Sequence, residues 1–581
     1  MFLPTTPEEI HALGWDRLDI ILVTGDSYID SPFIGVAVIG KILLNAGYRV
    51  GIIAQPDTAA GDDIRRLGEP RLFWGVTGGC IDSMVANYTA TGRRRKHDDY
   101  TPGNVNTRRP DRATIVYSNL IRRYFKHTCP IVLGGIEASL RRIAHYDFWS
   151  DAIRRSILFD AKADYLLYGM ADRAVCDLAA CLDEDGDPRE LRGLCYIART
   201  MPEGCLELPS FKVVAGSKEA FTRMFHLFYR NNDPVTARTL AQQQDTRYLV
   251  QTPPAWHLTG QELDAVHGFD YERDLHPYYR SAGEVKALET ICFAIATHRG
   301  CYGECNFCAI TVHQGRRVTW RSQASILEEA RALTLHPRFK GIIQDVGGPT
   351  ANMYGIECTR KEKEGGCPDR RCLFPKVCAK LPVNHAKQMA LLRALRAIKG
   401  IKKVVVASGI RHDLVLADKK HGTAYLREVV RYHVSGQLKM APEHSEPHVL
   451  RTMGKAGREE LLKFKNLFET LATRGKTPLF LTYYLIAAHP GCTEDDMRNL
   501  RAFALRDLRL LPEQIQIFTP TPSTYSTLMY WTERDSFTGS PCFVEKTVRG
   551  RERQKQILTD RGRVNHSPQD RRTRPRRRRG R

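Results

Sequence analysis

Three cysteines stand close together in the middle of the chain, within "HRGCYGECNFCAITVHQGR". Cys301, Cys305 and Cys308 follow the spacing C-x3-C-x2-C. Closed structural zinc and iron–sulfur sites usually take four protein ligands. Three thiolates leave one iron of a 4Fe–4S cluster without a protein ligand, and catalysis at a metal requires such an open position. The spacing therefore indicates a catalytic iron–sulfur site.

Two other interpretations of this run are open. A zinc site could be completed by His298 or His313, which stand at the edges of the same run. The three thiols could also be unrelated, but the chain has only 16 cysteines among 581 residues, so this spacing is rare by coincidence. Ligand spacing favours the iron–sulfur interpretation.

A second cysteine-rich stretch, "CTRKEKEGGCPDRRCLFPKVC", lies within residues 355–380. Its thiols are Cys358, Cys367, Cys372 and Cys378, with the spacing C-x8-C-x4-C-x5-C. A charged, glycine-containing insertion has too few apolar residues for a core of its own, so a metal-stapled loop is expected. Zinc in a closed four-thiolate site is the first interpretation, an auxiliary iron–sulfur cluster the second, and free or redox-active thiols the third.

The elements that would position the first site repeat as strand and helix. Short apolar runs are predicted as strands at 289–299, 339–348, 401–410, 436–444, 478–491 and 513–523. Amphipathic stretches between them are predicted as helices at 322–335, 386–400, 423–433, 458–475 and 493–508, the last opening with a capping-box pattern at Thr493 and Asp496. A closed barrel needs eight such units, so residues 285–540 predict an incomplete barrel. The three cysteines follow its first strand, on the catalytic face.

The N-terminal region, residues 1–185, also alternates strand-like and helix-like segments. Runs such as "LDIILVTGD" and "PIVLGGIEAS" look like buried parallel strands, which predicts a doubly wound α/β domain. Gly78–Gly79 and Gly134–Gly135 would lie where ligands bind in such sheets, although tight turns explain them equally well. Residues 186–284 are polar and weakly periodic, and we interpret them as a connecting or wrapping segment.

Positive charge is concentrated at the C-terminus. The formal net charge is +22, and residues 549–581 hold 14 Lys or Arg against three acidic residues, half of the excess. The segment 541–581 is therefore predicted to be a disordered, basic tail. Such a tail could contact RNA without sequence specificity, or could simply be solvated.

The cysteine loop on a six-unit partial barrel resembles the radical SAM superfamily. Phe307 precedes the last cysteine, as in that superfamily. The resemblance implies that Gly347–Gly348 contacts the methionine amino group of S-adenosylmethionine and that Glu443 bonds the ribose hydroxyls. Pro349 departs from the pattern, because an acidic residue often follows the glycine pair. Arg411 follows the third strand, where it could bind the carboxylate of the cofactor.

The stretches "THRGCYGECNFCAITVHQGR", "DVGGPTANMYG" and "CLFPKVC" together resemble the YgiQ family of radical SAM proteins, over nearly the whole chain except the tail. The resemblance implies an α/β fold with an N-terminal Rossmann-like domain of the cobalamin-binding type and a partial (β/α)6 TIM-like barrel. The D-x-H-x-x-G motif that gives a histidine to cobalt does not occur, which argues against histidine-ligated cobalamin. Cobalamin bound in another way has no support in the sequence.

The resemblance also implies an activity. Such an enzyme binds a 4Fe–4S cluster and S-adenosylmethionine and cleaves the latter reductively to a 5′-deoxyadenosyl radical, which abstracts hydrogen from a substrate. The substrate is not implied, and the electron donor would be a flavodoxin- or ferredoxin-like protein. Two alternatives are an RNA-modifying radical SAM enzyme and a non-catalytic, metal-stabilised protein that binds RNA or senses redox state.

The expected location of the protein in the cell follows from two features of the sequence. The N-terminus has no signal-peptide pattern, and the longest uncharged apolar run, near residues 477–493, is too short for a membrane span. A cytoplasmic protein without a membrane partner is expected. Thiols stay reduced in that compartment, so the cysteines are not expected to form a disulfide framework.

Overall fold

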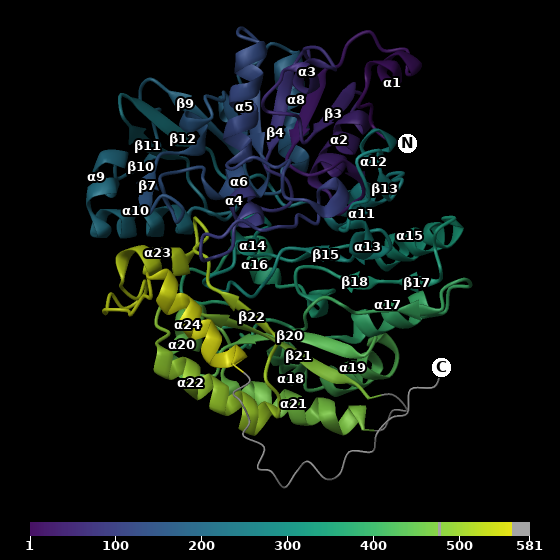
Figure 1. Cartoon of the computed structure of the whole chain (residues 1–581), viewed down its shortest axis with the longest axis vertical. Coiled ribbons are helices and arrows are strands. Elements are labelled where there is room, and N and C mark those ends of the chain that lie inside the picture. The colour runs from purple at the N-terminus through teal and green to yellow at the C-terminus, as the bar shows by residue number, and fades with distance from the viewer. Residues whose placement is uncertain (474–477, 561–581) are drawn as a thin grey trace, which may run out of the picture.

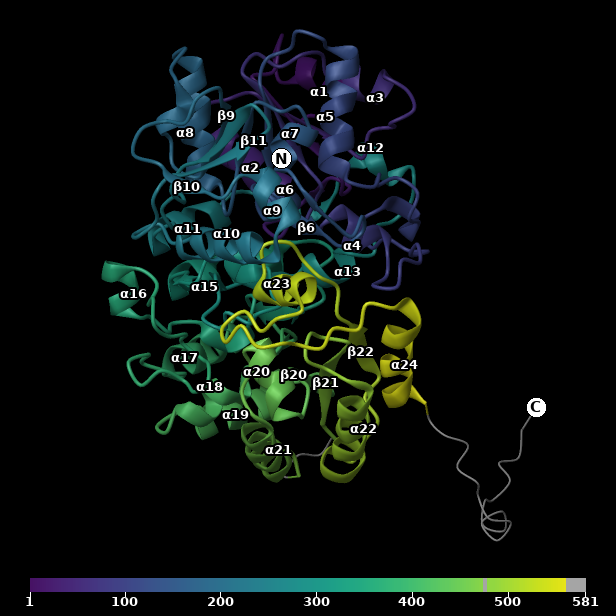
Figure 2. The same cartoon turned by 90° about the vertical axis from the view of Figure 1, so that its left-hand side faces the viewer.

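The computed structural model describes residues 1–473 and 478–560, which form two stacked halves (Figure 1). The N-terminal half is a large sheet covered by helices, and the half that follows is a partial barrel. The same stacking is visible a quarter-turn away (Figure 2). Among the described helices, none is long and apolar enough to cross a membrane. The predicted cytoplasmic location stays a prediction.

The N-terminal half is organised by one nine-stranded sheet with the order β10-β11-β12-β9-β8-β5-β4-β1-β3. Its strands are β1 (Ile20–Thr24), β3 (Val50–Ala54), β4 (Phe73–Thr77), β5 (Ile131–Gly134), β8 (Tyr165–Leu167), β9 (Leu194–Ala198), β10 (Leu206–Leu208), β11 (Leu240–Gln244) and β12 (Arg247–Gln251). The five strands from β8 to β3 are mutually parallel. The predicted doubly wound α/β domain is confirmed.

Both faces of this sheet are buried, as the continuous apolar strands predict. In β1, Ile21 and Val23 join one hydrophobic core and Ile20 and Leu22 join the other. The first core holds α5 (Ala113–Tyr124), and the second holds α2 (Gly35–Asn45) and α8 (Asp172–Asp183). Strand side chains point alternately to opposite faces, so a strand between two helical layers must be apolar at every position.

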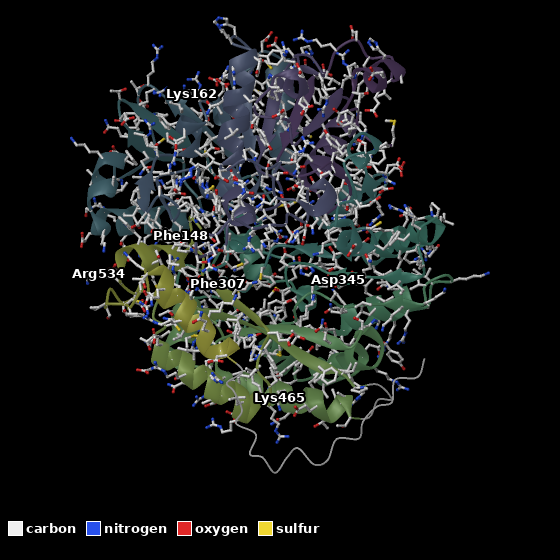
Figure 3. The ribbon with its side chains drawn as sticks, viewed as in Figure 1. Phe148, Lys162, Phe307, Asp345, Lys465 and Arg534 are labelled. Atoms are coloured by element: carbon white, nitrogen blue, oxygen red, sulfur yellow. The ribbon has the colours of Figure 1, made fainter. Side chains whose placement is uncertain are left out.

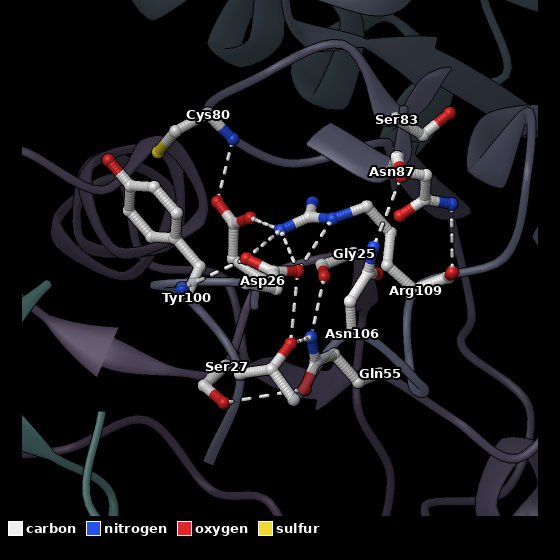
Figure 4. A network of polar contacts seen from close by, with 12 residues as sticks. Gly25, Asp26, Ser27, Gln55, Cys80, Ser83, Asn87, Tyr100, Asn106 and Arg109 are labelled. Carbon is white, nitrogen blue, oxygen red and sulfur yellow. Dashed lines mark hydrogen bonds and ion pairs between the residues drawn. The ribbon is translucent and has the colours of Figure 1, made fainter. Parts of the chain in front are cut away.

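The order of the parallel strands reverses between β1 and β4, and doubly wound sheets bind ligands beside such a switch point. Here a network of the chain's own side chains lies beside it (Figure 4). Arg109 is fully buried, forms ion pairs with Asp26 at 2.7 Å and Asp98 at 3.0 Å, and donates to the Gly78 carbonyl at 2.7 Å. Gly79 has φ +107°, and a Cβ there would lie 2.3 Å from Asp26 Oδ1. This glycine is explained by the internal network and needs no ligand.

The Arg109 network gives a stability prediction. Arg109→Met leaves two buried carboxylates without their cation, so the free energy of unfolding should fall by about 3–5 kcal/mol. The matched control is Arg93→Met, whose ion pair with Glu552 at 2.8 Å is mostly exposed and should be worth at most about 1 kcal/mol. Urea unfolding followed by tryptophan fluorescence measures both. Equal losses in the two variants would show that the buried network contributes nothing special.

Residues 186–284 differ from the prediction of a connecting segment. Strands β9 to β12 extend the N-terminal sheet through antiparallel pairs from β8 to β9, β9 to β12 and β12 to β11. The sequence of β11, "LAQQQ", is polar, yet Gln242 and Gln244 are buried. Their side-chain oxygens accept from the backbone N–H groups of Ala144 and Ser156. Glutamines whose side chains are hydrogen-bonded can therefore be buried in a core, and a hydrophobicity pattern does not reveal such positions.

The second half is a partial barrel, and its six strand regions lie where the sequence predicts them. They are β14 (Ala294–Ala296), β17 (Ile342–Ile343) with β18 (Asp345–Gly347), β19 (Lys403–Val404), β20 (Gln437–Glu443), β21 (Phe480–Ala487) and β22 (Gln514–Ile517). β14 pairs with β18, and β17 pairs with β19. β21 lies between β20 and β22 and pairs with both. All of these pairs are parallel. The Ile410 N–H donates to the Lys439 carbonyl at 3.2 Å, which joins the third strand region to the fourth.

Helices follow the barrel strands, and five of them lie where the sequence predicts them. These five are α15 (Gln323–Leu335), α17 (Ala386–Arg396), α19 (Gly422–Glu428), α21 (Arg458–Ala472) and α22 (Glu494–Phe503). A further helix, α24 (Val548–Thr559), was not predicted. The capping box at the start of α22 is confirmed, because Thr493 and Asp496 each accept from the other's backbone N–H.

Helix α24 corrects the prediction of a disordered tail over 541–581. It packs against α22 and β22 and supplies the sixth helix of the barrel (Figures 1 and 2). Leu558 and Gln554 are fully buried, and buried Arg551 donates to the Ala90 carbonyl at 2.9 Å. The basic composition hid this helix, because only one face of it is covered. Residues 561–581, the rest of the predicted tail, lie outside the described residues.

Candidate functional site

The three-cysteine loop leaves the barrel directly after β14. Two short strands, β15 (His298–Arg299) and β16 (Thr319–Trp320), pair antiparallel and close the base of the loop. Gly300 has φ +82°, and a Cβ there would lie only 1.8 Å from the Arg317 carbonyl oxygen, so the base requires glycine. The loop therefore stands at the carboxyl ends of the barrel strands, where catalytic groups of such folds gather.

The sulfur atoms on this loop lie close together. A Cβ on Gly303 would lie 3.2 Å from Cys301 Sγ and 3.6 Å from Cys305 Sγ, and the Gly303 N–H donates to Cys301 Sγ at 3.3 Å. Burial and the neighbouring Cys305 raise the pKa of Cys301. Burial, Cys305 and Cys301 raise the pKa of Cys308 to about 12. Cys301 and Cys308 therefore need a strongly cationic centre beside them to become thiolates, and an iron cluster is such a centre.

The described residues contain no three His, Cys, Asp or Glu side chains that converge on a single metal ion. A 4Fe–4S cluster has a different requirement, since each cysteine binds a different iron and the sulfurs surround the cluster. The half-buried and mutually close thiols of Cys301, Cys305 and Cys308 fit that donor set.

Arg411 lies beside the cysteine loop, 106 residues along the chain from Cys305. Its Nη1 is 3.5 Å from Cys305 Sγ, and its Nε donates to Asp413 Oδ1 at 2.9 Å. The backbone N–H of Arg411 donates to Asn352 Oδ1 at 2.8 Å, which fixes the residue at the start of α18 (His412–Ala417). The nearby carboxylate of Asp413 raises the pKa of Arg411, so the guanidinium places a permanent positive charge at the sulfurs.

Gly347 and Gly348 end the second barrel strand, next to the same loop. The Gly347 carbonyl accepts from the Thr297 N–H at 2.7 Å, and a Cβ on Gly348 would lie 2.6 Å from the His298 ring. The Thr297 hydroxyl bonds both the Gly347 carbonyl and His298 Nδ1. His298 thus lies under the glycine pair and packs against it.

Glu443 ends the fourth barrel strand with φ +71°, a backbone conformation that is rare for a residue with a side chain. Burial raises its pKa, and Lys455 Nζ lies 3.4 Å from its carboxylate. Lys455 is also buried, so this cation balances a carboxylate that would otherwise be desolvated alone. Sequence reasoning missed Lys455, because its spacing from Glu443 carries no recognisable motif.

Phe307 is partly buried and lies in an aromatic group with residues from the fifth and sixth strands. Its ring centroid is 6.2 Å from that of His489, which is 5.0 Å from that of Phe518. Figure 3 labels Phe307 and Asp345, and both lie in the part of the barrel that faces the N-terminal half. Asp345 accepts from the Ala407 N–H at 2.8 Å and so ties the second strand to the third.

The second cysteine set is brought together only in pairs. Cys358 and Cys372 are buried in a small apolar cluster with Tyr302, and Cys378 lies at its edge. Cys367 and Cys378 both lie near Arg370. A four-thiolate zinc site needs all four sulfurs around one ion, and the described side chains are not arranged in that way. Zinc or an auxiliary cluster here stays a prediction.

A buried ion pair connects the two cysteine segments. Lys361, on α16 (Thr359–Glu364), lies 3.6 Å from Glu304 of the first cysteine loop. Glu304 also pairs with Arg316 at 3.3 Å. Burial raises the pKa of Cys372 to about 11, although Lys361 opposes this. The insertion at 355–380 therefore packs directly against the first cysteine loop, which the sequence could not show.

Family comparisons agree with this site. A model described as "Radical SAM N-terminal" matches residues 2–294, and one described as "Radical SAM superfamily" matches residues 295–504. The chain is 54% identical over 560 residues to UPF0313 protein FN0734 of Fusobacterium nucleatum, covering 96% of this chain and 99% of that protein. It is 50% identical to a UPF0313 protein of Thermotoga maritima over 96% of this chain and 98% of that protein. The chain belongs to the UPF0313, or YgiQ, family of radical SAM proteins, and it is an enzyme whose reaction is unknown.

A search of solved structures gives two similar chains at low identity. TsrM of Kitasatospora setae, a radical S-adenosylmethionine methyltransferase with cobalamin and a [4Fe-4S] cluster bound, is 14% identical with a TM-score of 0.47, over 87% of this chain and 77% of that one. The cobalamin-dependent radical enzyme OxsB is 12% identical with a TM-score of 0.49, over 92% and 58%. What these proteins bind is not transferred to this chain. The sequence-based argument against histidine-ligated cobalamin stays a prediction.

Proposed function

We propose that this enzyme binds a 4Fe–4S cluster through Cys301, Cys305 and Cys308 and S-adenosylmethionine beside it at the barrel mouth. When bound, the cluster would supply the electron that cleaves the cofactor to a 5′-deoxyadenosyl radical and methionine. The observation that carries the proposal is the set of three half-buried thiols at the carboxyl ends of a partial barrel, with the Gly303 N–H directed at Cys301 and the Arg411 guanidinium at Cys305.

The other residues at the mouth would hold the cofactor. The Gly347–Gly348 segment presents bare backbone, held from below by His298, to the methionine end. Glu443, balanced by Lys455, would accept from the ribose hydroxyls, and Phe307 would pack against the nucleoside. Arg411 would attract the cofactor carboxylate toward the sulfurs. Each role needs the side chain to stay in place, and each of these side chains is buried or partly buried.

Anaerobic reconstitution tests the proposal. The full-length protein is loaded with iron and sulfide, reduced with dithionite and supplied with S-adenosylmethionine, and 5′-deoxyadenosine is measured by chromatography. Release of 5′-deoxyadenosine that depends on both reductant and cluster is expected. A protein with a fully assembled cluster that releases none, under conditions where a known radical SAM enzyme does, would contradict the proposed activity.

We propose a flavodoxin- or ferredoxin-like protein as the electron donor in the cell, because the cluster must be reduced by a low-potential one-electron carrier. RNA as a partner is tested by ending the chain after Asp560, which keeps α24 and removes residues 561–581. If RNA affinity disappears while 5′-deoxyadenosine release is retained, RNA binding is electrostatic and separate from catalysis. An RNA-modifying enzyme would instead act on RNA in the truncated form as well.

A further inference from the structure

A chamber of about 570 Å³ lies between the two halves of the molecule. Its upper wall is formed by the carboxyl ends of β1, β4, β5 and β8, and its lower wall by β14 and the residues that end β18. This volume is in the range of pockets that enclose small organic ligands. Gly347 and Gly348 line it, so the chamber adjoins the proposed cofactor site.

Most of the chamber wall is apolar. The segment that leads into α2 and the helix itself contribute Pro32, Phe33, Ile34, Val36 and Ile39, and the sheet adds Val132 and Leu167. Gly134 and Gly35 are open positions in this wall, because a Cβ on either would meet nothing within 4 Å. Apolar walls favour a ligand with substantial apolar surface.

The cation in the wall is already paired within the protein. Arg299, the one Lys or Arg among the described residues that line the chamber, donates to both carboxylate oxygens of Asp172 at 2.8 Å. Asp26 pairs with Arg109 at 2.7 Å, and Asp345 accepts from the Ala407 N–H at 2.8 Å. An anionic ligand would therefore find no free counter-ion in the wall and would have to be desolvated without compensation.

One imidazole supplies a free polar group. His267 Nδ1 is a buried atom with no hydrogen-bond partner among the described residues, and the side chain lines the chamber. Burial lowers the pKa of His267 well below its usual value, so the ring is neutral at pH 7. A buried polar atom left unpaired is costly, and a ligand with a hydrogen-bonding group would satisfy it.

We propose that this chamber binds the substrate, and that the substrate is a largely apolar organic molecule without an anionic group, with a hydrogen-bonding group directed at His267. This inference rests on the proposed function, because it places the substrate next to the cofactor that would attack it. The apolar wall offers water few hydrogen-bond partners beside Gly347 and Gly348, and His267 would hold one end of the molecule.

The test uses two naphthalene probes of similar size. Prodan is uncharged and carries one ketone, and 1-anilinonaphthalene-8-sulfonate is anionic. The full-length protein with its cluster, without S-adenosylmethionine, is titrated with each probe and fluorescence is recorded. We expect saturable prodan binding with blue-shifted emission, and binding of the sulfonate at least about tenfold weaker. Absence of saturable prodan binding, or equal affinity for the anion, would overturn the proposal.

Leucine substitutions in the chamber wall test whether prodan binds there. Gly134→Leu and Gly35→Leu would project a side chain into the chamber from open, unstrained positions, and each should weaken prodan binding at least about tenfold. Gly216→Leu is the matched control, since its Cβ also meets nothing within 4 Å but it lies outside the chamber wall. Thermal melting confirms that the variants are folded. If both chamber variants bind prodan like the control, the assigned site is wrong.

The two proposals can fail separately. Probe binding needs neither reductant nor S-adenosylmethionine, so a chamber that binds prodan in a protein that releases no 5′-deoxyadenosine overturns only the proposed activity. An active protein whose chamber variants bind prodan unchanged overturns only the chamber.

Discussion

Replacing Cys305 by alanine is expected to abolish 5′-deoxyadenosine release and to lower the iron content of the reconstituted protein. Cys305 interacts electrostatically with both other thiols, because it raises the pKa of Cys301 and of Cys308. Its sulfur lies 3.5 Å from Nη1 of Arg411. Groups that only support metal ligands cost about 10–100-fold when removed, so loss of a direct ligand should cost on the order of a thousandfold or more.

The matched control for Cys305→Ala is Cys129→Ala. Cys129 is also a half-buried free thiol, but it lies in the N-terminal half. Iron and sulfide content, the electron paramagnetic resonance spectrum of the reduced protein and 5′-deoxyadenosine release are measured for both variants. Full iron content and activity in Cys305→Ala would remove this cysteine from the site. A similar loss in both variants would point to general damage by thiol removal.

Replacing Gln554 by leucine should destabilise the barrel by about 2–4 kcal/mol. The fully buried side chain of Gln554 accepts from the Ala488 N–H at 2.8 Å and donates to the Cys492 carbonyl at 3.0 Å. Leucine fills a similar volume but leaves both backbone groups buried without these partners, and each unpaired group costs about 1–3 kcal/mol. Denaturant unfolding at constant protein concentration measures the loss.

Gln556→Leu is the matched control, because Gln556 lies on the exposed side of the same helix and the substitution is identical. Its effect should stay within about 0.5 kcal/mol. Ending the chain after Thr547 removes α24 altogether and should cost more than Gln554→Leu, whereas ending it after Asp560 should leave the unfolding curve unchanged. Unchanged stability in both Gln554→Leu and the shorter chain would mean that α24 is not part of the folded barrel.

Local patterns predicted much of the barrel correctly. Each strand region is a short apolar run and each helix before α24 is an amphipathic stretch, and both signals depend on neighbouring residues only. The capping box at Thr493 is local in the same way. Prediction failed where burial was achieved by polar groups. Gln242 and Gln244 in β11, and Arg551 and Gln554 in α24, are buried with hydrogen-bond partners from distant segments.

In the candidate site, too, local patterns identified some residues and missed others. Cys301, Cys305 and Cys308 could be identified from spacing, because ligands on one loop are constrained by the loop itself. The partners of Glu443 and Gly348 could not be identified. Lys455 and His298 carry no motif that links them to those positions, and only the packing of strands and helices brings each pair together.

The sequence by itself determined the donor atoms: three thiols at a fixed spacing, on a loop that follows the first strand of a six-unit barrel. Tertiary structure decided what surrounds them. It brought Arg411 to Cys305 across 106 residues, paired Arg109 with Asp26 beside the switch point of the N-terminal sheet, and left a chamber between the two halves. The physical reason is that spacing along a chain constrains only neighbours, whereas long-range contacts are fixed by how complete elements bury their apolar faces against one another.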